Sequence, residues 1–218
     1  MRLGRGRRVR HGGARRHPEQ LLELWEMESC PFCRRVREAL SELDLDWVCH
    51  PTPKGSGLRE DTPRWNGRYS FPFLRDPSTG VEMKESEAIL DYLHDTYGAG
   101  RPHSARLTRR FDLAGSMLAS GLRPKGMRTD HGDRTQPAKP LELWQYEGCP
   151  YSRKVRERLH ALCLEVVVRN VALGSPKRAT LVARGGKMQV PFLIDSSRGV
   201  ALYESEDILA YLDSVYAR

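Results

Sequence analysis

The apolar positions of the chain change their period in the same way in each half. Residues 21–27, LLELWEM, form a short apolar run typical of a buried strand. From Pro31 onwards the apolar residues Val36, Leu40 and Leu43 recur at the 3.6-residue spacing of a helix. Pro31 suits the first turn of that helix, because a backbone N–H has no partner there. The pattern therefore predicts a strand that passes directly into a helix.

The following positions extend this order to seven elements. Residues 45–50, LDWVCH, are typical of a second strand, and a polar stretch with helical potential comes next. The runs FPFLRD and VEMK flank a turn, PSTG, as in a hairpin. Ser86 is placed to cap a last helix that ends near Tyr97. The predicted order is β-α-β-α-β-β-α.

The same order occurs twice along the chain. A shift of 119 positions aligns residues 22–97 with residues 141–216 without a gap, and 34 of the 76 aligned positions are identical. Self-similarity of this kind indicates two copies of one structural unit. We expect four regions: a basic, disordered tail over 1–20, domain 1 over 21–98, a linker over 99–139 and domain 2 over 140–218.

The linker is too long for an ordinary connection inside a compact domain. Within it, residues 104–122 place apolar side chains on one helical stripe, opposite Arg106, Arg109 and Arg110. We expect this helix to bury its stripe against one or both domains. A basic amphipathic helix that lies on a membrane surface is the alternative. The rest of the linker is typical of a flexible segment.

Charge and hydropathy exclude some classes of function. The net charge is +8, but about +6 lies in residues 1–20 and about +6 in residues 98–139, while residues 21–97 carry about −6 and residues 140–218 about +2. The predicted domains therefore offer no basic face to a nucleic acid. No apolar run is long enough for a membrane span, and the arginine-rich start lacks the apolar core of a secretory signal. We expect a cytoplasmic protein with no nucleic-acid partner and no stable membrane insertion.

A cysteine stands at each predicted junction between the first strand and the first helix. Domain 1 has the motif CPFC, with Cys30 and Cys33, and domain 2 has CPYS, with Cys149 and Ser152. The partial positive charge of a helix N-terminus favours thiolate, the reactive form of cysteine. Cys33 is placed one turn further on to attack a mixed disulfide on Cys30, whereas Ser152 can only donate a hydrogen bond. The motifs predict a dithiol site in domain 1 and a monothiol site in domain 2.

The remaining cysteines are expected to be buried small residues. Cys49 lies inside a predicted strand, and Cys163 lies at the far end of the helix that follows Cys149. The odd number of five cysteines, without a secretory context, argues against a disulfide framework. A C-x-x-C pair is also half of many zinc sites, but the chain has no second pair to complete one. No metal is therefore expected, either at Cys30 and Cys33 or elsewhere in the chain.

These motifs resemble known families. CPFC and CPYS resemble glutaredoxin active sites, and the segments around FPFLRD, VPFLID and the two ESE motifs resemble the glutathione-binding half of glutathione S-transferases. The likeness is greatest to Omega-like transferases and to the prostaglandin E synthase type two family, and covers about 155 of the 218 residues. It implies an α/β fold with two tandem thioredoxin-like domains, joined here by a partly helical linker. A transferase of this family normally continues into an all-helical domain, but in this sequence the second thioredoxin-like copy stands in its place.

The resemblance also implies a glutathione site in each copy. Pro72 and Pro191 would follow cis peptide bonds, and the backbone of Phe71 and Val190 would pair with the cysteinyl part of glutathione. Two Glu-Ser pairs would hold its γ-glutamyl end: Glu85, Ser86, Glu204 and Ser205. A helix N-terminus with free N–H groups suits a carboxylate. Plain helix capping is the alternative for these pairs.

The expected function is that of a glutathione-dependent thiol–disulfide oxidoreductase, with glutathione as co-substrate and disulfides or glutathionylated molecules as substrates. Cys30 would be the nucleophile, Cys33 the resolving thiol, and Cys149 would form or exchange a glutathione mixed disulfide. Two alternatives stay open. One is a transferase that conjugates glutathione to an electrophile, and the other is a non-catalytic protein that holds glutathione or an iron–sulfur cluster. A homodimer is compatible with the surface that a missing helical domain leaves uncovered.

Overall fold

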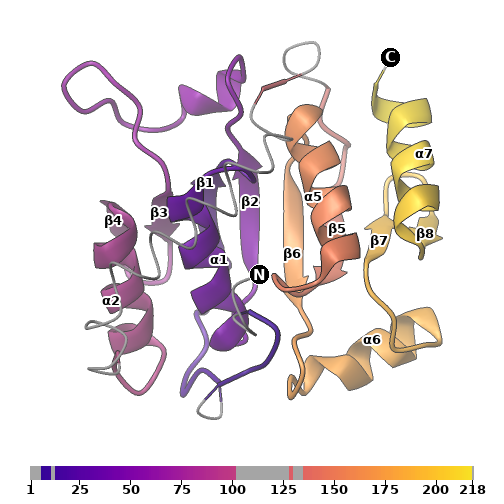
Figure 1. Ribbon diagram of the computed structural model, residues 1–218, viewed down its shortest axis with the longest axis horizontal. Coiled ribbons are helices and arrows are strands. Elements are labelled where there is room, and N and C mark those ends of the chain that lie inside the picture. Colours follow the sequence, from indigo (N-terminus) through magenta and orange to yellow (C-terminus); the bar gives the residue numbers. More distant parts are fainter. Residues whose placement is uncertain (1–5, 11–12, 102–127, 130–134, 218) are drawn as a thin grey trace.

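The computed structural model describes residues 6–10, 13–101, 128–129 and 135–217 (Figure 1). The predicted linker helix over 104–122 lies outside these residues. Domain 1 contains four strands, two α-helices and one short 3-10 helix: β1 (Leu22–Glu26), α1 (Pro31–Glu42), β2 (Trp47–Pro51), η1 (Gly57–Arg59), β3 (Phe73–Asp76), β4 (Val81–Lys84) and α2 (Ser86–Thr96).

Domain 2 repeats this order with a full middle helix. Its elements are β5 (Leu141–Gln145), α5 (Pro150–Ala161), β6 (Val166–Asn170), α6 (Lys177–Gly185), β7 (Phe192–Asp195), β8 (Val200–Leu202) and α7 (Ser205–Tyr216). The predicted α/β class with two thioredoxin-like units is confirmed, and no all-helical domain occurs in the described part of the chain.

The middle helix is the one element that differs between the copies. In domain 2, α6 buries Leu181 and ends at Gly186, whose left-handed conformation costs glycine no steric strain. The corresponding residues of domain 1 form only η1 and a loop. Pro63 stands in the middle of that stretch, where Val182 stands in α6. A proline inside a helix costs about 3 kcal/mol, which explains why domain 1 has no helix there.

The two domains share one eight-stranded sheet, which the sequence did not predict. The strand order is β4-β3-β1-β2-β6-β5-β7-β8, and β2 and β6 pair antiparallel at its centre. Val48 pairs with Val167, and Trp47 pairs with Val168. Both strands are rich in β-branched or aromatic residues and are the outer strands of their own copies. Their pairing removes two strand edges that would otherwise expose unpaired backbone groups.

The apolar core is continuous across this junction. Residues of β1, β2 and α1 belong to the same buried cluster as residues of β5, β6 and α5. The helices α1 and α5 lie side by side over the central strands (Figure 1). Nine of the twelve residues of α1 are buried, from Cys33 to Ser41. A shared core and a shared sheet indicate that the two copies are stabilised as one unit.

Part of the basic N-terminal segment lies against both domains. The N–H of Val9 donates to the carbonyl of Leu173 at 2.9 Å, and the N–H of Leu173 donates to the carbonyl of Arg7 at 2.9 Å. On the other side, the N–H of Arg10 donates to the carbonyl of Glu42 at 2.9 Å. Where the sequence predicts a disordered tail, these described residues bridge α1 and the loop after β6. Within the described chain, no helix combines the length and the apolar character that a membrane crossing needs.

Two candidate thiol sites

The two cysteine motifs follow strands that run in opposite directions. β1 runs parallel to β2, β5 runs parallel to β6, and β2 and β6 are antiparallel. The strands β1 and β5 therefore run in opposite directions, so Cys30 and Cys149, which follow them, lie at opposite ends of the strands. The fold keeps the two thiols apart instead of bringing them into one site.

Cys30 caps the first turn of α1. Its Sγ accepts a hydrogen bond from the backbone N–H of Cys33 at 3.5 Å. The Cys33 thiol, the backbone N–H groups of Cys33 and Phe32, and the charge of Arg37 lower the pKa of Cys30 to about 7, against burial, which raises it. The Cys30 side chain keeps 8% of its surface exposed. At neutral pH a large share of Cys30 is therefore thiolate.

Cys33 has the opposite protonation behaviour. It is fully buried, and burial together with the neighbouring thiol of Cys30 and the carboxylate of Glu26 raises the pKa of Cys33 well above its ordinary value. The two thiols of one motif are therefore separated into a more accessible, acidic one and a fully buried, protonated one. This division suits a nucleophile and a resolving thiol.

Cys149 has the same place in domain 2. Its Sγ accepts a hydrogen bond from the backbone N–H of Ser152 at 3.4 Å. The hydroxyl of Ser152 is buried and has no hydrogen-bond partner among the described residues. A buried hydroxyl without a hydrogen-bond partner lowers the stability of the fold. A sulfur atom bound to Cys149 would offer the Ser152 hydroxyl an acceptor.

The prolines and Glu-Ser pairs have matching geometry in both copies. The peptide bonds Phe71–Pro72 and Val190–Pro191 are both cis, as the family resemblance implies. Ser86 and Ser205 begin the last helices and are buried.

The residue before each serine has an unusual backbone. The φ angles are 72° at Glu85 and 62° at Glu204, and neither glutamate side chain caps its own helix. A positive φ at a residue other than glycine costs of the order of 1–3 kcal/mol and occurs most often at ligand sites. Helix capping by the glutamate side chain therefore does not account for the positive φ angles at Glu85 and Glu204.

An ion pair joins the cysteine helix to the Glu-Ser helix in each copy. In domain 1, Arg35 of α1 pairs with Glu87 of α2, next to Ser86. In domain 2, the Nζ of Lys154 lies 2.6 Å from an oxygen of Glu206, next to Ser205. These residues occupy equivalent positions in the repeat. The sequence analysis did not predict these two ion pairs, although the complementary charges recur at the same shift of 119 positions.

A further cation near the first site was also missed. The guanidinium of Arg59 lies 5.3 Å from the centre of the Phe71 ring. Its Nη2 is 3.4 Å from the sulfur of Met27, three residues before Cys30. Two hydrogen bonds from its Nε, to the carbonyls of Thr52 and Pro53, fix its position. Arg59 thus holds a positive charge between the loop before Cys30 and the cis-proline turn.

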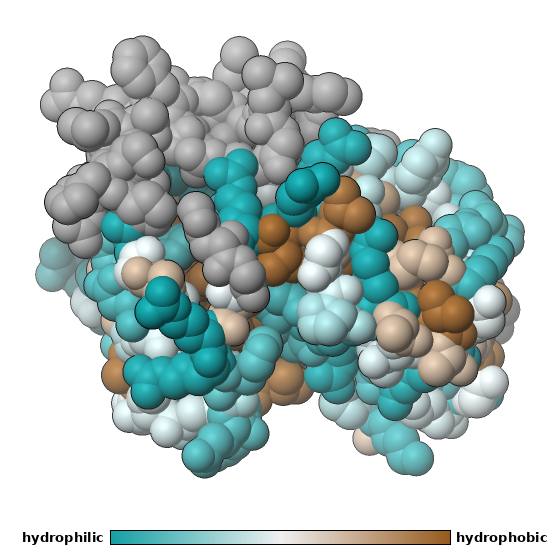
Figure 2. Space-filling model, turned by 90° about the horizontal axis from the view of Figure 1, so that it is seen from below, coloured by the Kyte–Doolittle hydropathy of each residue, from teal (hydrophilic) through white to brown (hydrophobic). Residues whose placement is uncertain are grey.

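Most of the exposed large apolar side chains of the described residues belong to domain 2. Five large apolar residues of the described chain are exposed, and one of them, Phe32, lies beside Cys30. The other four lie in domain 2, in α5, after β6, in α6 and before β7: Tyr151, Leu173, Val182 and Met188. From below, apolar patches interrupt a mostly hydrophilic face (Figure 2). Among the described residues, domain 2 therefore exposes more large apolar side chains than domain 1.

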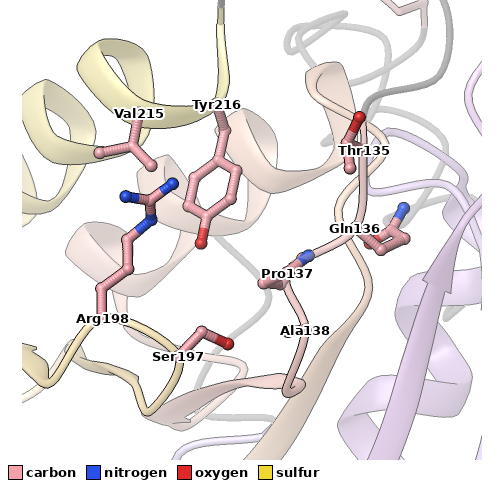
Figure 3. Close-up of a pocket in the computed structure, with 8 residues that line it drawn as sticks. All are labelled: Thr135, Gln136, Pro137, Ala138, Ser197, Arg198, Val215 and Tyr216. Atoms are coloured by element: carbon pink, nitrogen blue, oxygen red, sulfur yellow. The ribbon is translucent and has the colours of Figure 1, made fainter.

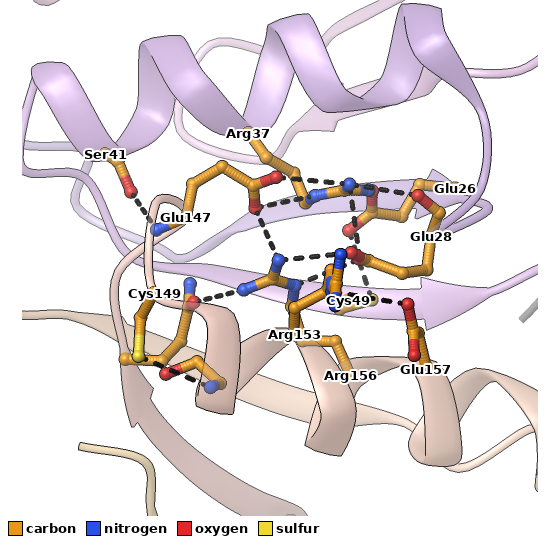
Figure 4. A network of polar contacts seen from close by, with 12 residues as sticks. Glu26, Glu28, Arg37, Ser41, Cys49, Glu147, Cys149, Arg153, Arg156 and Glu157 are labelled. Atoms are coloured by element: carbon orange, nitrogen blue, oxygen red, sulfur yellow. Dashed lines mark hydrogen bonds and ion pairs between the residues drawn. The ribbon is translucent and has the colours of Figure 1, made fainter. Parts of the chain in front are cut away.

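Buried charges hold the two domains together between the sites (Figure 4). The Nε of Arg37 donates to Glu147 at 2.9 Å, and the Nε of Arg156 donates to Glu28 at 3.0 Å. Each bond joins one domain to the other. Although burial raises it, the charges of Arg156 and Arg37 hold the pKa of Glu28 at about 2. The network links α1 and α5 to Glu28 and Glu147, which stand two residues before Cys30 and Cys149.

A cavity of about 390 Å³ lies away from both cysteines (Figure 3). It is close to the start of β5, whereas Cys149 follows the other end of that strand. Its lining consists of Thr135, Gln136, Pro137, Ala138, Ser197, Arg198, Val215 and Tyr216. None of the predicted site residues lines it.

The model of the glutathione S-transferase N-terminal domain family matches the chain twice, over residues 24–102 and 143–218. Among solved structures, a trimeric glutathione transferase of Leishmania is 17% identical with a TM-score of 0.33, covering 91% of this chain and 68% of its own. A glutathione transferase of Bombyx mori is 20% identical with a TM-score of 0.32, covering 56% of this chain and 70% of its own. No curated protein matches the chain.

Proposed function

Because the chain belongs to the glutathione S-transferase N-terminal domain family, we propose that it is a glutathione-dependent thiol–disulfide oxidoreductase with two unequal sites. The observation that carries this proposal is the division between Cys30 and Cys33. The pKa of Cys30 is lowered to about 7, while that of Cys33 is raised. Exchange through a dithiol needs a thiolate that attacks first and a second thiol that stays protonated until its turn.

The first half-reaction takes place on Cys30. Its thiolate attacks one sulfur of a disulfide substrate, a mixed disulfide forms, and the other sulfur leaves as a thiolate that takes up a proton from water. The negative charge of Cys30 disappears in this step. That charge is one of the causes that raise the pKa of Cys33, so its loss makes Cys33 easier to deprotonate.

The second half-reaction releases the substrate. Cys33 loses its proton to water and attacks the sulfur of Cys30, and the substrate thiol leaves with the electron pair of the broken S–S bond. The product is a Cys30–Cys33 disulfide. Two molecules of glutathione then reduce it and form one molecule of glutathione disulfide, which balances the two electrons of the cycle.

Domain 2 would use glutathione for both roles. Cys149 attacks a glutathionylated molecule, takes over its glutathionyl group and releases the reduced thiol. A second glutathione attacks the mixed disulfide, and glutathione disulfide leaves. The unpartnered hydroxyl of Ser152 supports this proposal, because it can donate to the sulfur beside Cys149. Val190 and the pair Glu204 and Ser205 would bind the peptide part of glutathione, as Phe71, Glu85 and Ser86 would in domain 1.

The test is reduction of a glutathionylated peptide by the full chain, with glutathione as the reductant. We expect Cys30→Ser to abolish turnover at the first site and Cys149→Ser to abolish it at the second, so that the double variant is inactive. The control is Cys163→Ser, which changes a buried cysteine outside both motifs and should keep full activity. A double variant that is as active as the unmodified chain would exclude the proposal.

A second candidate is conjugation of glutathione to an apolar electrophile in domain 2. It is favoured by the exposed apolar side chains of domain 2, among them Val182 and Met188. Conjugation consumes no disulfide and gives a thioether. An assay with an apolar electrophile therefore separates it from the first proposal. We expect Val182→Asp to reduce conjugation much more than it reduces turnover of a small glutathionylated peptide.

A further inference from the structure

Three buried ligand atoms meet where the two domains join. The Sγ of Cys49 lies 3.4 Å from Oε1 of Glu26 and 4.0 Å from Nε2 of His160. All three ligand atoms lie within 4.8 Å of one another. Glu26 ends β1, Cys49 lies in β2 and His160 lies in α5, so both domains contribute. Figure 4 shows Cys49 and Glu26 at the centre of the interdomain network.

The orientation of His160 suits a metal ligand. Its Nδ1 lies 2.8 Å from the backbone carbonyl of Arg156, which can only accept a hydrogen bond, so Nδ1 is the donor. The lone pair of Nε2 is then directed to the side of Cys49. A histidine that donates its second nitrogen to a backbone carbonyl is the usual arrangement in metal sites.

The carboxylate of Glu26 is also oriented by a second hydrogen bond. Arg37 donates to Oε2 of Glu26, and this leaves Oε1 facing Cys49. A thiolate, an imidazole and a carboxylate are together the donor set of zinc. Zinc bonds of about 2.0–2.3 Å place ligand atoms within roughly 4 Å of each other. The cluster therefore needs only a small contraction to enclose an ion.

The equivalent positions in the other copy do not provide these ligands. The positions equivalent to Glu26, Cys49 and His160 in the other copy hold three residues that do not suit zinc: Gln145, Val168 and Ser41. Gln145 accepts a hydrogen bond from Arg156 at 2.5 Å, and Ser41 donates to Asn170 at 2.9 Å. The approximate twofold relation between the two domains creates two equivalent positions for such a cluster. All three potential ligands occur together at only one of them.

The charges around the cluster are compatible with an added cation. Arg37 on α1 and Arg156 on α5 face three carboxylates, those of Glu26, Glu28 and Glu147. With the three carboxylates ionised and Cys49 neutral, one buried negative charge is in excess. A divalent ion bound to the Cys49 thiolate brings one net positive charge and neutralises the site.

We propose that Glu26, Cys49 and His160 bind one zinc ion between the two domains, with water as the fourth ligand. On binding, the thiol of Cys49 gives up its proton to solvent and a Zn–S bond forms, without any change of oxidation state. The ion ties β1 and β2 of domain 1 to α5 of domain 2. Its ligands do not include Cys30, Cys33 or Cys149, so the proposal does not depend on the function of those thiols.

The test begins with the metal content of the full, reduced chain. Protein is prepared from zinc-supplemented medium, and a second sample is unfolded and refolded with zinc so that burial cannot prevent loading. We expect about one zinc per chain in at least one sample. X-ray absorption at the zinc edge should show one sulfur bound to the ion together with nitrogen and oxygen ligands. Less than one tenth of a zinc per chain in both samples would overturn the proposal.

Variants then identify the ligands. Cys49→Val and His160→Ser introduce residues that the repeat itself has at the equivalent positions, and both should lose zinc. The controls Cys30→Ser and Cys163→Ser should keep it. Two sulfur atoms bound to the ion, or loss of zinc in Cys30→Ser but not in Cys49→Val, would overturn the proposal. These results do not require the variants to fold equally well, because the sulfur count is measured on the unmodified chain.

Discussion

Val48 in β2 pairs with Val167 in β6, and each residue is the counterpart of the other in the repeat. The junction of the two domains therefore has an approximate twofold axis at this pair. Trp47 pairs with Val168, the counterpart of Cys49, which continues the same relation. A contact in which the same surface of each copy meets the other is typical of symmetric dimers. Here it lies inside one chain.

The axis relates the pair Arg37–Glu147 to the pair Arg156–Glu28. Removing one partner of a buried ion pair leaves an uncompensated charge and costs about 3–5 kcal/mol. We expect Arg37→Ala to lower the free energy of unfolding by that amount, because Arg37 faces Glu26, Glu28 and Glu147. Denaturant unfolding at neutral pH measures it.

Arg184→Ala is the matched control for that substitution. Arg184 pairs with Glu142 at 3.0 Å, but its side chain is half exposed. Such a pair contributes about 0–1 kcal/mol. Equal losses of stability in the two variants would show that the interdomain network does not stabilise the fold.

The reactivity of Cys30 should follow its lowered pKa. The alkylation rate of Cys30 is expected to reach half its maximum near pH 7, where thiolate and thiol are equally populated, and to fall about tenfold per pH unit below that. Mass spectrometry of the peptide that contains Cys30 measures the rate separately from the other cysteines.

A variant tests the cause of that shift. The hydrogen bond from the Cys33 thiol is the largest contribution that lowers the pKa of Cys30. We expect Cys33→Ala, which has no donor in its side chain, to move the midpoint to higher pH. Cys33→Ser, which keeps a donor, should move it less. A midpoint that is the same in both variants would assign the shift to the helix N-terminus alone.

Glu26 should make stability depend on pH between about 4.5 and 6. Its pKa is about 6 in the folded protein and 4.5 in the unfolded reference, so the folded state binds the proton more tightly. The stabilisation is complete below pH 4.5 and is lost as the pH rises through 6, by about 2 kcal/mol. In metal-free buffer, Glu26→Gln should flatten this part of the stability curve. A curve of the same slope in the variant would assign the pH dependence to other groups.

Local signals explain why part of the structure was predictable. The N-terminus of α1 follows from Pro31 after Cys30, because this signal is local. The start of α2 was predicted within one residue, but Ser86 is its first helical residue and not its cap, since Glu85 precedes the helix and makes no side-chain capping bond. Even the cis bond before Pro72 was expected from the family resemblance. In contrast, domain 1 has no full middle helix, because Pro63 interrupts a stretch whose other residues have helical potential.

The contacts that join the domains were not predictable from such signals. Arg37 meets Glu147 over 110 positions, and Cys49 meets His160 over 111 positions. On the sequence alone, Arg37 is an ordinary polar residue of an amphipathic helix, and Cys49 is an isolated cysteine in a strand. Only the pairing of β2 with β6 brings these residues together, and the sequences of two outer strands do not indicate which partner each strand pairs with.

The difference between the two thiol sites is expected to depend on one sulfur atom. Ser152 is buried at the position of Cys33, and its backbone N–H contacts Cys149 as that of Cys33 contacts Cys30. We therefore expect Ser152→Cys to allow a disulfide between Cys149 and the introduced thiol under mild oxidation, with two thiols lost together from domain 2. The unmodified domain 2 should lose the Cys149 thiol only by forming a mixed disulfide with glutathione.

The reciprocal change tests the same idea in domain 1. Cys33→Ser should leave a mixed disulfide on Cys30 that only external glutathione resolves, so turnover becomes more dependent on the concentration of glutathione. Alkylation followed by mass spectrometry of the intact chain counts the thiols in each variant. Cys49 should stay reduced throughout, because it is buried and its raised pKa disfavours thiolate. If Ser152→Cys forms no internal disulfide although the fold is unchanged, the surroundings of the two motifs, and not the second sulfur, determine how the sites differ.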